Sequence, residues 1–162
     1  MKFLGIIPAR YSSTRLEGKP LKLIEGHTMI EWVYKRAKKS NLDSLIVATD
    51  DERIYNEVLN FGGQAIMTST EHTNGTSRIA EVCEKIKDYD VIINIQGDEP
   101  LIEYEMINSL IKTFKENNIP VISDGSDNHL CLIDTYSTYG VTGHDASLLL
   151  SKANITCNKN GI

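Results

Sequence analysis

The chain has 162 residues, of which 41% are hydrophobic and 24% charged, and its formal net charge is −5. This composition is typical of a globular protein of about one domain and excludes a solvated disordered chain. The acidic total argues against a nucleic-acid binder with a broad basic surface, but it allows nucleotides, whose phosphates need only a few well-placed cations. No apolar run approaches the roughly 20 residues that cross a bilayer. From the charge and the lack of such a run together, we expect neither nucleic acid nor a membrane as a partner.

The cysteines and the first residues favour a cytoplasmic protein. Cys83, Cys131 and Cys157 show no Cys-x-x-Cys spacing, which argues against a disulfide framework or a zinc site and fits a reducing compartment. The apolar run 3–9 is cut off by Arg10, so we interpret it as a buried first strand rather than a signal-peptide core.

Hydrophobic periodicity predicts strands and helices in alternation. The predicted elements are, in chain order, strand 3–7, helix 29–37, strand 44–48, strand 64–67, helix 79–86, strand 91–95 and helix 107–114. Residues 49–52 are interpreted mainly as a helix start. This order predicts an α/β fold with a mostly parallel sheet and helices on both faces. Ligands of such sheets bind beyond the carboxyl ends of the strands, which directs attention to residues 8–20, 49–52, 68–78 and 96–100.

The loop 8–20 follows the first predicted strand and carries three cations, Arg10, Arg15 and Lys19. These cations and the backbone N–H groups of such a loop can meet the negative charges of a triphosphate. Neither the Walker pattern nor the Rossmann glycine pattern is present. The alternative is a polar loop whose cations are only solvated.

Two further places in the sequence carry polar residues that suit a nucleotide. Asp98, after the strand 91–95, can hold Mg²⁺ through a carboxylate oxygen, although it could also cap the next helix. Segment 71–78 combines a glycine with small polar residues that allow a base to approach the backbone, and Thr76 or Ser77 can cap the helix that follows.

A boundary between two parts of the chain is predicted near residue 118. Beyond the break at 119–120 come a polar, turn-rich stretch at 123–128, an apolar strand at 129–133 and a helix after Gly143. We therefore predict two parts, a nucleotide-binding half-domain over 1–118 and a strand-helix segment over 119–162 that packs onto it.

Residues 1–117 resemble the 3-deoxy-manno-octulosonate cytidylyltransferases, also called CMP-Kdo synthetases. The matching motifs lie at 6–21, 46–50, 67–68, 72–78 and 96–100 and follow the order of that family. Glu17 departs from the pattern, because the family usually has proline there. The resemblance implies a Rossmann-like nucleotidyltransferase fold and a reaction in which the Kdo anomeric hydroxyl attacks the α-phosphate of CTP. The products would be CMP-Kdo, a lipopolysaccharide precursor, and pyrophosphate.

The same resemblance implies roles for individual residues. Arg10 and Lys19 would neutralise the β- and γ-phosphates with help from Arg15, Asp98 would bind Mg²⁺, and Gln96 would lie near the base or sugar. The residues implied to shape the cytidine pocket are Pro8, Ala9, Asn74, Gly75, Thr76 and Arg78.

Residues 120–162 are instead similar to a stretch of the small domain of serine hydroxymethyltransferase, which makes the chain resemble a chimera. The pyridoxal-phosphate lysine and the carboxylate-binding arginine of that enzyme are absent from this stretch, so its chemistry does not transfer. The sugar-binding half of the cytidylyltransferases has no recognisable counterpart among the motifs of this sequence. The sequence therefore predicts an impaired or inactive CTP:Kdo cytidylyltransferase, and the alternative is a non-catalytic α/β chimera with residual nucleotide binding. Association into a homodimer through an interface foreign to the family is a further prediction.

Overall fold

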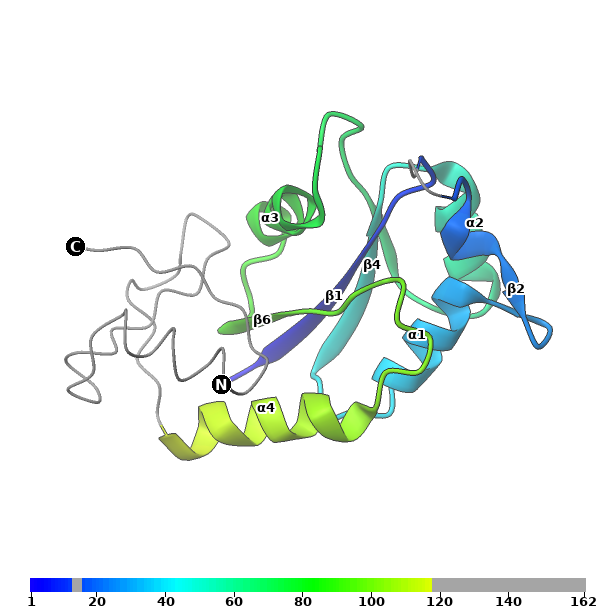
Figure 1. Cartoon of the computed structure of the whole chain (residues 1–162). Helices are drawn as coiled ribbons and strands as arrows, with labels where there is room; N and C mark the ends of the chain where they lie inside the picture. Colours follow the sequence, from blue (N-terminus) through cyan, green and yellow to red (C-terminus); the bar gives the residue numbers. More distant parts are fainter. Residues whose placement is uncertain (13–15, 118–162) are drawn as a thin grey trace, which may run out of the picture. The chain divides into compact units, whose positions relative to one another are not determined.

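The computed structural model describes residues 1–12 and 16–117, which contain a four-stranded parallel sheet with helices against both faces (Figure 1). The chain divides after Glu116 into two units, and all the elements below lie in the first, apart from the last residue of the final helix. The strands are β1 (Phe3–Ala9), β2 (Leu23–Ile24), β3 (His27–Thr28), β4 (Ser44–Thr49), β5 (Ala65–Met67) and β6 (Val91–Asn94). The helices are α1 (Met29–Ala37), α2 (Glu52–Asn60), α3 (Gly75–Lys85) and α4 (Tyr104–Asn117), and a single 3₁₀ turn spans Lys19–Leu21.

The strand order of the sheet is β5-β4-β1-β6, with every neighbouring pair parallel. The chain moves from β1 outward to β4 and β5 and then returns to place β6 on the other side of β1. The order therefore reverses between β1 and β6. In open α/β sheets the crevice at the carboxyl ends of two such strands is where ligands bind.

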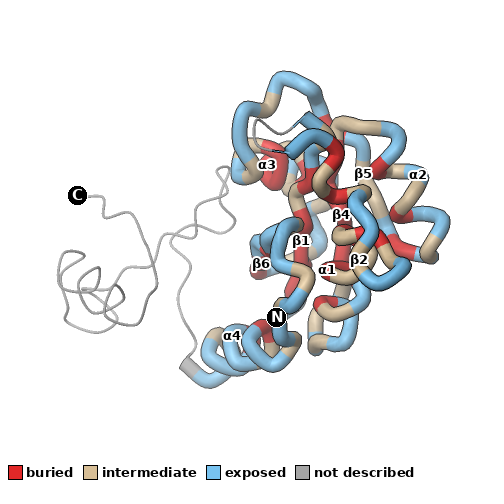
Figure 2. The backbone as a smooth tube through the Cα atoms, turned by 45° about the vertical axis from the view of Figure 1, so that its right-hand side comes forward, coloured by how far each residue is buried: buried red, intermediate tan, exposed pale blue. Residues whose placement is uncertain are grey.

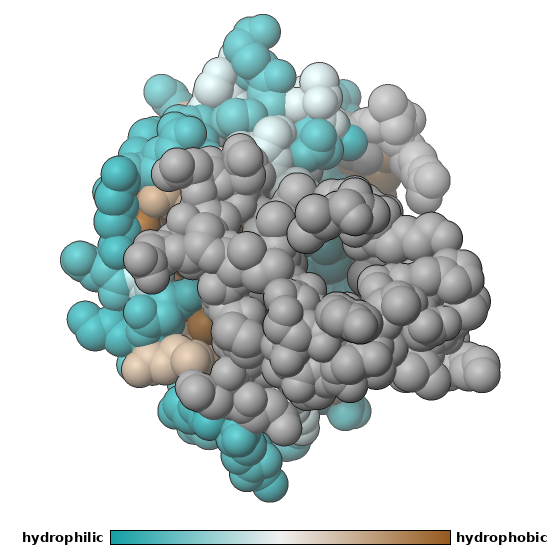
Figure 3. Space-filling model, turned by 90° about the vertical axis from the view of Figure 1, so that its left-hand side faces the viewer, coloured by the Kyte–Doolittle hydropathy of each residue, from teal (hydrophilic) through white to brown (hydrophobic). Residues whose placement is uncertain are grey.

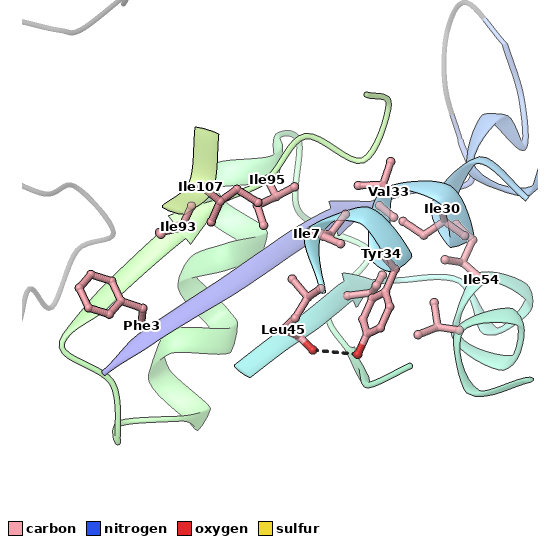
Figure 4. Close-up of a cluster of buried hydrophobic side chains, with 14 of the residues drawn as sticks. Phe3, Ile7, Ile30, Val33, Tyr34, Leu45, Ile54, Ile93, Ile95 and Ile107 are labelled. Carbon is pink, nitrogen blue, oxygen red and sulfur yellow. Dashed lines mark hydrogen bonds between the residues drawn. The ribbon is translucent and has the colours of Figure 1, made fainter. Parts of the chain in front are cut away.

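The strands are buried on both faces, which explains why they read as continuous apolar runs. Phe3, Ile7 and Leu45 point to the face covered by α1, α2 and α4, where they pack with helix residues such as Val33 and Ile107 (Figure 4). Side chains that alternate with these point to the opposite face, which α3 covers. Figure 2 shows the buried residues gathered along β1 and β4 and on the inner side of α3.

The predicted α/β architecture and its seven predicted elements are confirmed, with boundaries shifted by a few residues. The start at 49–52 is also confirmed, because Asp51 caps α2 by accepting the Arg53 backbone N–H. The sequence interpretation missed the β2–β3 hairpin. Its turn residues, Glu25 (φ 50°) and Gly26 (φ 82°), have the two positive φ angles of a two-residue hairpin turn.

None of the described helices is both long enough and apolar enough to cross a membrane. From one side of the molecule, the described residues that are visible present a mainly hydrophilic surface, with small apolar areas between (Figure 3).

Candidate functional site

The backbone that follows β6 approaches the end of β1 closely at Gly97. An ideal Cβ on Gly97 would lie 2.8 Å from the Pro8 carbonyl oxygen and 3.4 Å from Ile7 Cγ2. The ladder continues one residue past β6, where the Ile95 N–H donates to the Ile6 carbonyl at 2.9 Å. Only a residue without a side chain fits in the space between the two backbones. The close approach of the backbones brings Asp98 to the loop after β1.

We expect Gly97→Ala to lower the free energy of unfolding by about 1–3 kcal/mol, since the added methyl meets a backbone atom that cannot rotate away. Chemical denaturation measures this change. Gly75→Ala is the matched control, because its Cβ would meet Pro8 as well, but at 3.1 Å from a ring carbon. Equal losses in the two variants would show that the approach at Gly97 is not constrained.

Lys19 and Asp98, 79 positions apart in the chain, form an ion pair at this point. Lys19 Nζ lies 2.8 Å from Asp98 Oδ2, and the two side chains are 34% and 55% exposed. An exposed pair of this kind contributes at most about 1 kcal/mol to stability. Both groups therefore remain available to a charged ligand, and the structure brings together two of the residues predicted to act on phosphate and metal.

The loop that carries Lys19 is closed at its base by Tyr11 and Gly18. The Gly18 N–H donates to the Tyr11 carbonyl at 2.9 Å, and Gly18 has φ 65°, a left-handed conformation that suits glycine. The Tyr11 ring also contacts Arg53, whose guanidinium carbon lies 3.3 Å from the ring centroid. Sequence reasoning missed Arg53, and no local motif could have indicated it, because the contact joins α2 to a distant loop.

Arg53 is itself held by Asp51 at the start of α2. Its Nε and Nη2 atoms donate to the two carboxylate oxygens at 2.9 and 2.7 Å. These hydrogen bonds from Arg53 hold the pKa of the Asp51 carboxyl below its usual range. The cation above Tyr11 is thus fixed by the residue that caps α2.

Arg10 reaches the neighbouring loop between β5 and α3. Its Nη1 donates to the Thr73 carbonyl at 3.4 Å, and the side chain is exposed. Pro8 lies against the first residue of α3, since an ideal Cβ on Gly75 would be 3.1 Å from Pro8 Cγ. The cationic loop and the start of α3 therefore border one another, as a shared site for phosphate and base requires.

Asn74 is the N-cap of α3. Its Oδ1 accepts the Ser77 N–H at 2.8 Å. The expectation that Thr76 or Ser77 caps the helix was wrong, because α3 begins at Gly75, just before these residues. An Asn side chain in extended backbone reaches the N–H three residues on. Gly75 and Thr76 thus form the first turn, where backbone N–H groups lack helical acceptors.

Arg78 is buried beneath the site. It is 2% exposed, its Nη2 donates to Asp50 Oδ2 at 2.6 Å, and its Nη1 donates to the Thr68 hydroxyl. These contacts join α3 to the ends of β4 and β5. The guanidinium of Arg78 is therefore turned to protein groups, so its predicted part in the cytidine pocket would be that of a support.

The remaining predicted residues differ in how they are placed. The Ala9 side chain is 4% exposed and packs in the core, so only its backbone could contact a nucleotide. Gln96 is exposed two residues after the end of β6, and its carbonyl accepts the Glu99 N–H at 3.3 Å. Arg15 lies outside the described residues.

Glu81, which the sequence interpretation did not single out, collects three donors. Its Oε1 lies 2.6 Å from Lys85 Nζ, and its Oε2 accepts the Ser69 N–H at 2.8 Å and lies 2.7 Å from His72 Nε2. The hydrogen bond from Lys85, followed by those from Ser69 and His72, lowers the pKa of Glu81 to about 2. The only signal in the sequence was the spacing of Glu81 and Lys85 on one helix.

This shift predicts a stability that depends on pH. Because the pKa of Glu81 is lowered from 4.5 to about 2, its contribution is complete above pH 4.5 and is lost as the pH falls towards 2. In urea denaturation at several pH values, we expect the stability difference between wild type and Glu81→Gln to shrink over this window. A difference that stays constant would contradict the lowered pKa.

The residues at the carboxyl ends of β1 and β6 include one predicted metal ligand, Asp98. Within 1–12 and 16–117, no three or more His, Cys, Asp or Glu side chains form a cluster that could hold a metal ion. Asp98 is the one residue that the sequence predicts as a metal ligand. A separate cavity of about 340 Å³ is lined by Arg36, Lys39 and residues 103–105, none of which belongs to the predicted site.

Residues 4–159 match the family model described as Cytidylyltransferase. The chain belongs to the cytidylyltransferase family. It is 92% identical over 117 residues to the 3-deoxy-manno-octulosonate cytidylyltransferase of Fusobacterium nucleatum, a match that covers 72% of this chain and 48% of the relative. The enzyme of the same name from Leptospira interrogans is 54% identical over 110 residues, covering 67% of this cytidylyltransferase-family chain and 44% of the relative. The chain thus spans about half the length of the curated relatives it matches.

Two solved structures are similar in fold to this chain. A CMP:2-keto-3-deoxy-manno-octonic acid synthetase complexed with CTP matches with a TM-score of 0.71 and 44% identity, covering 73% of this chain and 49% of that one. A cytidylyltransferase from Leptospira borgpetersenii, 24% identical with a TM-score of 0.65, covers 72% and 50% and shares the fold. The predicted Rossmann-like nucleotidyltransferase fold and the family resemblance are confirmed. Residues 120–162, with their predicted likeness to serine hydroxymethyltransferase, lie outside the described residues, as does the rest of the predicted segment 119–162, and that part of the interpretation stays a prediction.

Proposed function

We propose that this chain binds CTP in the crevice between the carboxyl ends of β1 and β6. The observation that carries the proposal is the contact between Lys19 and Asp98, which sets a cation and a carboxylate 2.8 Å apart where the strand order reverses. A cation there suits the triphosphate, and the carboxylate suits a phosphate-bound metal. The family match and the relative complexed with CTP support the choice of nucleotide.

In this proposal the two loops divide the nucleotide between them. Arg10, Lys19 and Arg15 bind the β- and γ-phosphates with charge-assisted hydrogen bonds. The base lies against the first turn of α3, where Asn74, Gly75 and Thr76 border Pro8.

Mg²⁺ would be held by Asp98 together with the nucleotide phosphates. One carboxylate plus substrate phosphates is a common coordination for Mg²⁺, so the single acid fits this ion. When bound, the metal would neutralise charge that develops on the phosphates. Lys19 and Arg10 would add fixed positive charge beside the leaving pyrophosphate.

The reaction we propose for the family site joins CTP to Kdo. The anomeric hydroxyl of the sugar attacks the α-phosphorus and loses its proton, the bond to the β-phosphate oxygen breaks, and CMP-Kdo and pyrophosphate form. Relatives named for this reaction are about twice as long as the stretch they share with the chain. We propose that the described residues supply the CTP side of this reaction, and the prediction of little or no turnover is tested by the experiment below. A cytoplasmic location and a homodimer remain predictions.

The second candidate is a nucleotide-binding protein without catalysis. It would keep the Lys19–Asp98 contact and the nucleotide contacts proposed above but form no product. The two candidates differ in one measurable product, pyrophosphate.

Calorimetric titration with CTP and Mg²⁺, with ATP as the competing nucleotide, tests the binding. Pyrophosphate release with CTP, Kdo and Mg²⁺ then separates the candidates. Asp98→Asn is compared with Glu99→Gln, which removes the same charge one position away. Sustained turnover that is lost only in Asp98→Asn establishes the enzyme and defeats the second candidate. No CTP binding by the wild type defeats both.

A further inference from the structure

The Glu81 carboxylate ties the loop between β5 and α3 to the helix at two points. Ser69 donates its N–H to Oε2 at 2.8 Å, and His72 Nε2 lies 2.7 Å from the same oxygen. The side chain of Glu81 is 21% exposed and that of His72 19%, so these contacts are partly shielded from water. The loop is therefore held at its beginning and again just before Thr73.

The residues directly after these two points are those that meet the proposed nucleotide site. The Thr73 carbonyl accepts from Arg10, a cation of the phosphate loop. Asn74 caps α3, and Gly75 packs against Pro8 at the end of β1. A shift of the loop would move all three contacts at once.

Stabilisation of α3 alone does not account for Glu81. An i,i+4 pair with Lys85 contributes a few tenths of a kcal/mol to a helix and needs only one carboxylate oxygen. The other oxygen is directed to the loop. Its two partners belong to a segment that makes no part of the helix.

We propose that Glu81 is a positioning residue for nucleotide binding: its carboxylate holds residues 69–73 so that Arg10 and the first turn of α3 keep their spacing. This inference rests on the proposed binding of CTP. Glu81 acts through the loop and does not touch the nucleotide. Misplacing a binding group by a small distance weakens the interactions it makes, which is the effect expected here.

The test compares Glu81→Gln with Glu84→Gln in the full chain. Both remove one negative charge from α3, but Glu84 is exposed and takes part in none of the Glu81 contacts described above. A glutamine at 81 presents an NH₂ group to one of three donors, so it cannot satisfy them all. Hydrogen exchange of residues 69–74 is measured without nucleotide, and the Kd for CTP is measured by calorimetry below the unfolding temperature of both variants.

We expect Glu81→Gln to speed exchange in residues 69–74 and to raise the Kd for CTP about five- to twentyfold, with Glu84→Gln close to wild type. Unchanged exchange, or faster exchange with an unchanged Kd, overturns the positioning role while leaving the proposed function intact. Failure of the wild type to bind CTP overturns the proposed function and the positioning role together. Because exchange is measured without nucleotide, these failures can be told apart.

Discussion

Arg78→Ala is expected to lower the free energy of unfolding by about 3–5 kcal/mol. The guanidinium is 2% exposed and joins Asp50 to Thr68, so its removal leaves a carboxylate and a buried hydroxyl without their charged partner. The substitution also removes the polar contacts that join α3 to the ends of β4 and β5. Urea denaturation followed by circular dichroism measures the change.

Arg53→Ala is the matched control for this prediction. Arg53 also pairs with an aspartate, Asp51, but its side chain is 58% exposed. Water replaces an exposed partner at little cost, so we expect a much smaller change there. Arg78→Lys should fall between the two, because a lysine keeps the charge but cannot reach both acceptors. Equal effects for Arg78→Ala and Arg53→Ala would show that the buried pair has no special weight.

Lys19→Ala is expected to weaken CTP binding by about 1–3 kcal/mol, the cost of one charge-assisted hydrogen bond. Lys19 lies beside Asp98 at the point where strand order reverses, and its ammonium is partly exposed. Arg10→Ala should act in the same direction. Calorimetry gives the Kd of each variant, and added salt should reduce the difference from wild type because mobile ions screen exposed charges.

Lys87→Ala provides the control for charge alone. Lys87 is exposed between α3 and β6, away from the cationic loop, and its loss changes the net charge by the same amount. An equal loss of CTP affinity in Lys87→Ala and Lys19→Ala would mean that the loop contributes only general electrostatic attraction. Unchanged CTP affinity in Lys19→Ala would show that the loop is a solvated turn that does not bind the phosphates.

Local pattern was enough to predict most of the sheet and its helices. Runs such as 3–7 and 44–48 are apolar without alternation because helices cover both faces of the sheet, and a buried parallel strand has no polar face to show. The cap of α3 was misplaced because several residues in 73–77 can accept a helix N–H. Which of them does so depends on the backbone angle at Asn74, φ −144°, where the chain leaves the loop.

The α/β order, the cationic loop after the first strand and the acid after the last could be predicted because each depends on residues that are neighbours in the chain. The contact of Lys19 with Asp98, 79 positions away, and the inward turn of Arg78 to Asp50 could be found only in the folded chain. The same holds for the contact by which Glu81 holds the loop at Ser69. These contacts depend on which strands lie side by side and which face each helix covers. Strand order is set by packing of the whole sheet, and no local pattern of residues contains it.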